Sequence, residues 1–309
     1  MGTSYLAVGY ECNHKCMCCP LTTYDRLHKR LKFEEIVECV ALIKKSNTAN
    51  HIVLSGGEPM LHPDFFKILE YVVKQGFYIT VLSNSSMCSN REFVRKLRSI
   101  IPDNRFDIVT AIHSSTPAIH DRITGVEGSL LETLEGIDNL VDNGIPVTIK
   151  HIFNQISLST VVETFQYLEK HYPPQVAFQF CTMDYSGRAG KNIEELFVPM
   201  EEIRKSLEVL LDYLQTRMVK KRKVSLIETP LCLLDPYYWK YFNNASAGLD
   251  TYIAPNTDSR RADFDVQSEC GAYYEPCEKC AVQKWCAGTW KSAYNYRQEG
   301  MLNPICNIK

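Results

Sequence analysis

Six short apolar runs alternate with stretches of helical periodicity through the first part of this chain, and this alternation limits the fold more than any other feature. The runs are rich in Val, Ile and Phe, and they are Tyr5–Tyr10, His51–Ser55, Phe77–Ser83, Asp107–His113, Val147–Phe153 and Val176–Cys181. This composition is typical of strands that are buried on both faces. Strands that alternate with helices form a parallel sheet. The sequence therefore predicts an α/β fold, either a partial barrel of six β/α units or an open, doubly wound sheet.

Apolar side chains at helical spacing separate these strands. They form one face in each of four segments, at residues 33–41, 65–73, 130–141 and 161–168. Gly76 and Gly144 follow two of the segments, at the position where glycine commonly ends a helix. A further helix is predicted at Met200–Arg217, where it closes the sixth unit.

The alternation stops after residue 222. The basic run Lys220–Lys223 marks a boundary, and its charges favour a solvated linker. Beyond it, short apolar pieces, Tyr-rich stretches and clustered cysteines replace the β/α pattern. We therefore predict a barrel domain over residues 1–222 and a smaller, metal-stapled module over residues 223–309.

Composition narrows the class of protein. A net charge of −2 gives no strong field that would favour nucleic acid or a membrane surface. The chain has no run of eighteen apolar residues, and its first residues lack the basic segment and apolar run of a secretory signal. We expect a cytoplasmic protein with neither nucleic-acid nor membrane partners.

The cysteines are unusual in number and position. The chain has 13, and they crowd near its two ends. A disulfide scaffold would be shorter and secreted, whereas clustered thiols in a reducing cytosol favour metal binding.

Cys12, Cys16 and Cys19 form a C-x3-C-x2-C motif directly after the first predicted strand. Three thiolates can hold three irons of a cubane and leave the fourth iron open, as a catalytic metal site requires. The alternatives are chance crowding and a zinc knuckle, in which His14 or Cys18 would act as the fourth ligand. The loop follows the carboxyl end of a strand, where barrel active sites assemble, and this favours the cubane.

Gly56, Gly57, Glu58 and Pro59 follow the second predicted strand. Two glycines let a backbone approach a ligand closely, and a plain turn is the alternative. Together with the cysteine motif, this segment resembles the defining motifs of the radical S-adenosylmethionine (SAM) superfamily, in which GGEP contacts the amine of SAM. The resemblance covers nearly the whole chain. It implies a partial TIM-type barrel, a [4Fe–4S] cluster on the three motif cysteines, and SAM as cofactor.

One residue departs from the family pattern. Relatives carry an aromatic or aliphatic residue before the third cysteine, and this chain has Cys18 there. The family spacing favours Cys19 over Cys18 as the ligand.

The resemblance also implies SAM contacts at the ends of later strands, from Ser83, Asn84, Ser114 and Asn154. Ser114 is assigned to the ribose or carboxylate of SAM. Asn154 is assigned to the ribose, with a plain turn as the alternative. Gly187 and Arg188, after the sixth strand, are interpreted as a solvated loop at the barrel mouth.

Cys277, Cys280 and Cys286 form a second motif, C-x2-C-x5-C. A fourth ligand must come from elsewhere, and zinc is the alternative to an iron–sulfur cluster. The spacing resembles the auxiliary-cluster module, called SPASM or its shorter twitch form, that follows many radical SAM barrels. The resemblance implies a second [4Fe–4S] cluster on these three cysteines and Cys232, with Cys270 as the alternative fourth ligand.

The segments Leu231–Asp235 and Cys277–Gly288 also resemble the radical SAM protein of the His-Xaa-Ser peptide-maturation system. This implies an oxidoreductase that reductively cleaves SAM to a 5′-deoxyadenosyl radical. The radical would oxidatively modify a ribosomally made peptide by a cross-link or a similar C–H functionalisation. The implied partners are the peptide substrate and an electron donor such as flavodoxin or ferredoxin.

Two other functions compete with this hypothesis. One is radical SAM modification of a small molecule or nucleoside, and the other is a non-catalytic iron–sulfur redox protein. The GGEP segment argues against the latter, because a redox sensor needs no SAM site. Cys181 ends the sixth strand on the side of the predicted cavity, and its thiol is either a hydrogen-atom donor to a substrate radical or a packed core group.

Overall fold

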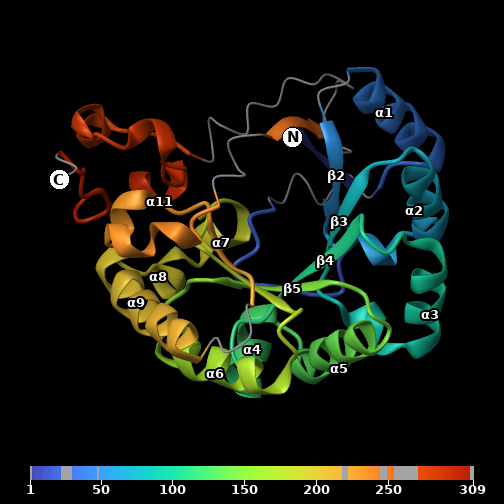
Figure 1. The fold of residues 1–309 in the computed structure, drawn as a ribbon, viewed down its shortest axis with the longest axis horizontal. Coiled ribbons are helices and arrows are strands. Elements are labelled where there is room, and N and C mark those ends of the chain that lie inside the picture. The colour runs from blue at the N-terminus through green and yellow to red at the C-terminus, as the bar shows by residue number, and fades with distance from the viewer. Residues whose placement is uncertain are drawn as a thin grey trace.

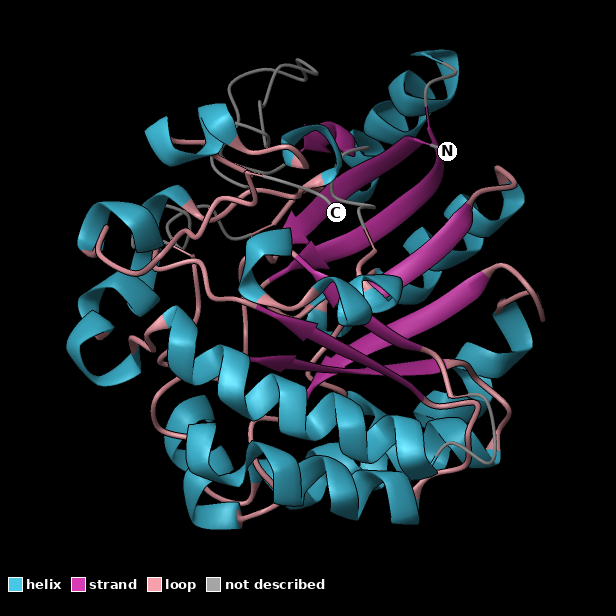
Figure 2. Cartoon of the chain, turned by 60° about the vertical axis from the view of Figure 1, so that its left-hand side comes forward, coloured by secondary structure: helices cyan, strands magenta, loops and turns pink. Residues whose placement is uncertain are grey.

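Parallel strands form one sheet whose order follows the chain except at one edge. The computed structural model describes residues 2–21, 30–46, 49–217, 222–243, 249–253 and 271–306. Within these residues the sheet has eight strands in the order β7-β6-β5-β4-β3-β2-β1-β8, and every neighbouring pair is parallel. Helices form an arc outside the strands, so the sheet is a partial barrel (Figures 1 and 2).

The first six strands confirm the six predicted runs. They are β1 (Gly2–Gly9), β2 (Ala49–Gly56), β3 (Tyr78–Leu82), β4 (Phe106–Ala111), β5 (Val147–Ile152) and β6 (Ala177–Cys181). Their outward-facing residues, such as Ile52, Ile108 and Phe180, are fully buried beneath the helices. This layer of apolar contacts is the core of the barrel.

The described α-helices are α1 (Phe33–Ser46), α2 (Phe65–Lys74), α3 (Arg91–Ile100), α4 (Pro117–Thr124), α5 (Ser129–Asp142), α6 (Val161–His171), α7 (Gly187–Lys191), α8 (Ile193–Leu196), α9 (Met200–Arg217) and α11 (Lys291–Tyr296). Five of these helices, α1, α2, α5, α6 and α9, match the segments where the sequence predicts them, and the other described α-helices were not predicted. Gly76 and Gly144 lie just beyond the ends of α2 and α5 with φ of 90° and 67°, as expected for glycines that end helices.

Two strands follow the boundary that the sequence predicts at residue 222. β7 (Val224–Ile227) pairs with β6, and β8 (Leu249–Ile253) pairs with β1. The sequence pattern did not predict either strand, because both are short. In addition, β8 pairs with a strand that is distant in the chain, and a long helix separates β7 from its partner β6. The barrel sheet thus includes residues on both sides of the boundary, while the division into two domains stays a prediction.

Arg222 corrects the interpretation of the basic run as a solvated linker. Its side chain is buried, and its guanidinium donates hydrogen bonds to the carbonyl oxygens of Glu169, Tyr172, Pro173 and Val176 at the end of α6. The guanidinium also lies 4.4 Å from the ring centroid of Phe178. A cation at a helix C-terminus is favourable because the last carbonyls have no partner within the helix. Arg222 therefore anchors the chain where it enters β7.

Across the described residues, every helix falls short of the length and apolarity that crossing a membrane requires.

Candidate functional site

The loop that carries Cys12, Cys16 and Cys19 lies at the carboxyl ends of the parallel strands and is held from two sides. On one side, the backbone N–H groups of Lys15 and Met17 donate to carbonyl oxygens at the end of α4, at 2.8 and 2.7 Å. On the other side, the carbonyl oxygen of Cys19 accepts from the first residues of α7, at 3.0 and 3.1 Å. The backbone of the loop is therefore fixed without any contribution from a bound group.

The thiols of this loop face in two directions. Cys12, Cys16 and Cys19 are partly exposed, whereas Cys18 is 6% exposed and packs in the core. Cys18 Sγ lies 3.8 Å from His113 Nε2. Burial, together with the charges of Cys12 and Cys19, raises the pKa of Cys16 to about 12, which indicates that these three thiols lie near one another. The arrangement favours Cys19 over Cys18 as a ligand and fits three thiolates around one cluster.

The GGEP segment lies directly against this loop. The N–H groups of Gly57 and Glu58 donate to the carbonyl oxygens of Gly9 and Glu11, both at 2.8 Å. A Cβ atom at Gly56, whose φ is 131°, would lie 1.9 Å from the oxygen of Gly9. A Cβ atom at Gly57 would lie 2.3 Å from the oxygen of Glu11. Both positions therefore require glycine, and they fix the backbone beside the cysteines.

The carboxylate of Glu58 is buried and joins the ends of β2 and β3. It accepts hydrogen bonds from Met60 N at 3.0 Å, from Ser83 Oγ at 2.9 Å and from Asn84 N at 2.7 Å. Burial raises the pKa of this carboxyl to about 7, against the opposing effect of the three hydrogen bonds. Pro59 begins the short 3₁₀ helix Pro59–Leu61, where its missing N–H is not needed. Glu58 thus holds the GGEP segment against the end of β3.

Asn84 connects β3 to the cysteine loop. Its Nδ2 donates to Asn13 Oδ1 at 2.8 Å, and Asn13 Nδ2 donates to Ser86 Oγ at 2.7 Å. Asn13 lies inside the cysteine motif, so the loops after β1 and β3 are linked through side chains. The structure therefore brings the motif cysteines, GGEP, Ser83 and Asn84 together.

Ser114 and Asn154 are fully buried, and their polar atoms bond within the protein. Ser114 Oγ lies 3.0 Å from Thr160 Oγ1 and accepts from Thr116 N at 3.1 Å. Asn154 donates to Ile152 O and accepts from Ser157 N, both at 3.0 Å, which is the bonding of a turn asparagine. Their roles toward SAM stay predictions.

Gly187 and Arg188 correct the interpretation of this segment as a solvated loop. Gly187 has a φ of 55°, and a Cβ atom there would lie 2.2 Å from Pro20 O. Arg188 donates from its backbone to Cys19 O and from Nη1 to Cys16 O at 3.3 Å. The two residues therefore hold the cysteine loop. The sequence contained one signal for this role: Gly187 follows a strand and begins a helix at the same edge of the sheet as the cysteine motif.

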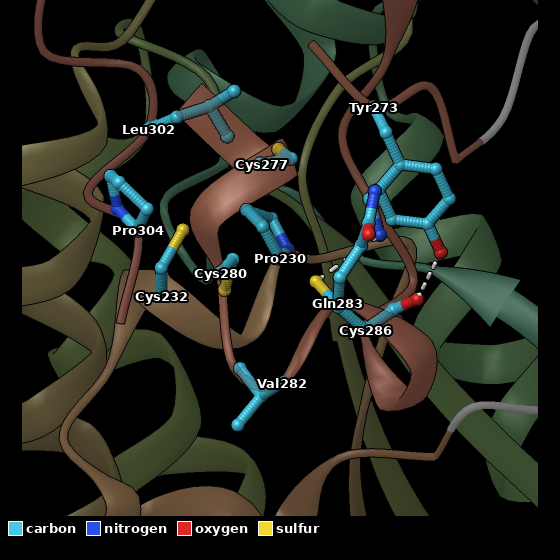
Figure 3. Close-up of a pocket in the computed structure, with 11 residues that line it drawn as sticks. Pro230, Cys232, Tyr273, Cys277, Cys280, Val282, Gln283, Cys286, Leu302 and Pro304 are labelled. Carbon is cyan, nitrogen blue, oxygen red and sulfur yellow. Dashed lines mark hydrogen bonds between the residues drawn. The ribbon is translucent and has the colours of Figure 1, made fainter. Parts of the chain in front are cut away.

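One pocket is lined by Cys232, Cys277, Cys280 and Cys286 (Figure 3). Pro230, Val282, Leu302 and Pro304 contribute apolar walls. The N–H groups of Leu231 and Gly288 donate to Cys286 Sγ at 3.2 and 3.3 Å. The predicted alternative, Cys270, lies outside the described residues.

The chemistry of this pocket suits a cluster held by four thiolates. Burial, together with the charges of the other three cysteines, raises the pKa of Cys232 to about 11, against the opposing effect of a hydrogen bond from the Asn303 backbone. In a cubane each thiolate binds a different iron, so four thiols that line one pocket fit the ligand set of such a cluster.

Hydrogen bonds attach the segment that follows this pocket to the barrel mouth. Trp290 Nε1 donates to Thr182 O at 3.2 Å, and Ser292 Oγ donates to Asp184 Oδ1 at 2.7 Å. Thr182 and Asp184 follow β6 directly. The C-terminal segment accordingly lies beside α7 and α8 in Figure 1.

Cys181 lies at the end of β6 and is 1% exposed. Its Sγ lies 3.8 Å from His151 O. Burial raises the pKa of this thiol to about 12, so it is protonated at neutral pH. Its role as a hydrogen-atom donor stays a prediction.

Comparisons with known proteins agree with this arrangement. The model of the Radical SAM superfamily matches residues 6–168, which is more than half of the chain. Fe-coproporphyrin III synthase of Methanosarcina barkeri is 24% identical over 206 residues, which cover 65% of this chain and 49% of that protein. A probable GTP 3′,8-cyclase of Pyrobaculum aerophilum is 28% identical over 198 residues, which cover 63% of this chain and 62% of that protein. The chain thus matches about half to three fifths of the length of these relatives.

Two solved structures share the fold over almost the whole chain. SuiB of Streptococcus suis, bound to the precursor peptide SuiA, has a TM-score of 0.69 at 13% identity, covering 99% of this chain and 76% of SuiB. Native anSMEcpe with bound AdoMet has a TM-score of 0.67 at 13% identity, covering 98% of this chain and 93% of that one. The family match and the cysteine loop beside GGEP lead to one conclusion: this chain belongs to the radical SAM superfamily.

Proposed function

We propose that this protein is a radical SAM peptide maturase that oxidatively modifies a ribosomally made peptide. The observation that carries the proposal is the pocket lined by four cysteines, attached to the mouth of a barrel whose cysteine loop suits a SAM-binding cluster. An oxidative modification needs a place for the electron that the product radical loses, and a second cluster site beside the barrel would provide it.

The cofactors and the protein have separate tasks. When bound, SAM and the two [4Fe–4S] clusters supply a 5′-deoxyadenosyl radical and an electron acceptor. Cys12, Cys16 and Cys19 would hold the first cluster, and the backbone of Gly56 and Gly57 would approach the SAM amine. Glu58 and Asn84 keep that backbone in register through their hydrogen bonds to β3 and the cysteine loop.

Cys232, Cys277, Cys280 and Cys286 would hold the auxiliary cluster. The N–H groups directed at Cys286 Sγ favour the thiolate form that a metal ligand needs. Reduced flavodoxin or ferredoxin would supply the first electron, as the resemblance implies.

The peptide substrate is supported by the fold neighbours. SuiB was solved bound to the precursor peptide SuiA, and anSMEcpe was solved bound to AdoMet and a peptide. Both likenesses extend through the C-terminal segment, because they cover 99% and 98% of this chain.

A second candidate is a radical SAM enzyme that acts on a small molecule or nucleotide. The observation that favours it is the sequence identity of 28% to a relative named as a probable GTP 3′,8-cyclase, which is higher than the 13% to SuiB and to anSMEcpe. That match covers 63% of this chain and 62% of that protein.

Co-expression with short peptides encoded beside the gene tests the proposal. The wild-type protein should convert one peptide to a product that is lighter by the mass of two hydrogen atoms, and a Cys16→Ala variant should leave it unchanged. Mass spectrometry of the purified peptide is the measurement. An unaltered peptide, together with SAM-dependent consumption of GTP by the wild type, would favour the second candidate instead.

A further inference from the structure

A charged pair lies on the inner wall of the barrel. Lys150 belongs to β5, and its neighbours Ile149 and His151 are fully buried beneath the helices. Because side chains alternate along a strand, Lys150 lies on the opposite face, toward the barrel interior. Glu228 directly follows β7, and its Oε2 lies 3.6 Å from Lys150 Nζ.

Two more polar groups share this part of the barrel. The thiol of Cys181 and the phenol of Tyr5 lie within electrostatic reach of Lys150. Tyr5 belongs to β1, which is separated from β5 by three strands of the sheet. The group therefore gathers side chains from several strands around one interior space, where a barrel places its substrate.

The backbone of Glu228 is strained. Its φ is 51°, and only Ser85 shares a positive φ among the other non-glycine residues that the structure describes. This left-handed conformation is unfavourable for a residue with a side chain. Thr182 Oγ1 donates to Glu228 O, and Thr182 O accepts from Trp290, so the strained turn is held by the same residue that attaches the C-terminal segment. Glycine would fit here without strain, yet the chain keeps a carboxylate, which is typical of a functional position.

The bonding capacity of the pair is only partly used. The separation of 3.6 Å between Lys150 and Glu228 is longer than a good hydrogen bond. The ammonium has three N–H donors, and one of them is directed at the Cys181 thiol. Some 20% of the Lys150 side chain and 26% of the Glu228 side chain are exposed. Since the other face of β5 is buried, this exposure faces the interior. Partly buried charges with unused donors and acceptors are costly, and a bound ligand would complete them.

The charges of the pair restrict the ligand. Lys150 alone would suit a phosphate or carboxylate, but Glu228 repels both. A neutral group that offers an acceptor and a donor on the same side suits the pair best. The carbonyl oxygen and the N–H of one extended residue are such groups, because both point to the same side of the chain. We infer that Lys150 and Glu228 dock one extended residue of the peptide substrate, whose carbonyl oxygen accepts from Lys150 and whose N–H donates to Glu228. This inference deepens the proposed function and rests on it.

The test compares a neutral, nearly isosteric variant, Lys150→Met/Glu228→Gln, with the wild type and with Lys170→Met, which removes an exposed lysine from α6. All three proteins are reconstituted anaerobically. The double variant should raise KM for the peptide about tenfold or more, as the loss of two hydrogen bonds implies. Its iron content, its affinity for SAM and its peptide-free formation of 5′-deoxyadenosine should match those of the wild type.

Melting temperatures provide a readout that does not depend on the peptide. The double variant should melt at the wild-type temperature or above, and Glu228→Gly should melt higher because the strain is relieved. A double variant that melts about 5 °C lower, or binds SAM about tenfold more weakly, would overturn the inference, since the pair would then be structural or a cofactor contact. Unchanged KM for the peptide would also overturn it. If the wild type modifies no peptide, the proposed function is wrong, but the inference is not thereby excluded. An unchanged melting temperature and unchanged SAM binding in the double variant would still support a ligand site at Lys150 and Glu228.

Discussion

The backbone N–H of Asn84 donates a hydrogen bond of 2.7 Å to the carboxylate of Glu58, and this bond joins the end of β3 to the GGEP segment after β2. Ser83 and Met60 complete the environment of the carboxylate. Three donors around one buried carboxylate hold the segment in place without contact to any ligand. The contribution of Glu58 to the stability of the protein therefore depends on whether its carboxyl group is protonated.

Glu58→Gln should change how stability depends on pH. Burial raises the pKa of Glu58 from 4.5 to about 7, so between these pH values the folded protein keeps a proton that the unfolded chain releases. The free energy of unfolding therefore falls as pH rises through this window, by an amount on the order of 3 kcal/mol. The melting temperature of the wild type minus that of the variant should fall between pH 5 and pH 7. A difference that is constant with pH would contradict this assignment.

Cys19→Ala and Cys18→Ala should separate the two adjacent thiols. Cys19 shares a site with Cys12 and Cys16, whereas Cys18 packs in the core near His113. Cys19→Ala should lose the SAM-dependent change in the electron paramagnetic resonance of the reduced cluster. Cys18→Ala should keep it, at a stability cost of about 1 kcal/mol. The reverse pattern would make Cys18 the ligand.

Cys286→Ala should lower iron by about four atoms per chain, because a [4Fe–4S] cluster is bound by four thiolates. Cys306→Ala removes an exposed thiol that does not line the pocket and serves as the control. SAM cleavage without substrate should persist in both variants. Equal iron in Cys286→Ala and the wild type would refute the auxiliary cluster.

Gly187→Ala should disturb the cysteine loop. The new Cβ would lie 2.2 Å from Pro20 O, so the loop or α7 must move. Gly144→Ala is the control, because its φ of 67° is similar and no atom lies within 4 Å of the Cβ position. Both variants incur the strain of a positive φ, about 1 kcal/mol, but only Gly187→Ala should lose affinity for SAM. Equal SAM affinity in the two variants would show that the close approach is not needed.

Arg222→Ala should destabilise the protein by about 3 kcal/mol, since four carbonyls lose a buried, charged donor. Arg105→Ala removes an exposed arginine that donates to one carbonyl, Gly76 O, and should cost about 0.5 kcal/mol. Thermal denaturation compares the two. Similar melting temperatures would mean that Arg222 does not anchor the end of α6.

The sequence by itself determined the first six strands, the helix Met200–Arg217 and the two cysteine motifs. Each of these is a local pattern, because side-chain alternation, helical periodicity and ligand spacing are written within a few consecutive residues. The association of the cysteine loop with GGEP was also expected, since parallel strands place their carboxyl ends at one edge.

Only the tertiary structure decided which contacts join distant parts of the chain. The pairing of β8 with β1, the buried position of Arg222 and the support of the cysteine loop by Gly187 and Arg188 depend on residues far apart in sequence. The structure also places Cys18 in the core, and it brings Cys232 to the C-terminal cysteines, as the family resemblance implied. A local pattern carries no information on such contacts, because their energy comes from packing and hydrogen bonds that exist only once the sheet has closed around its core.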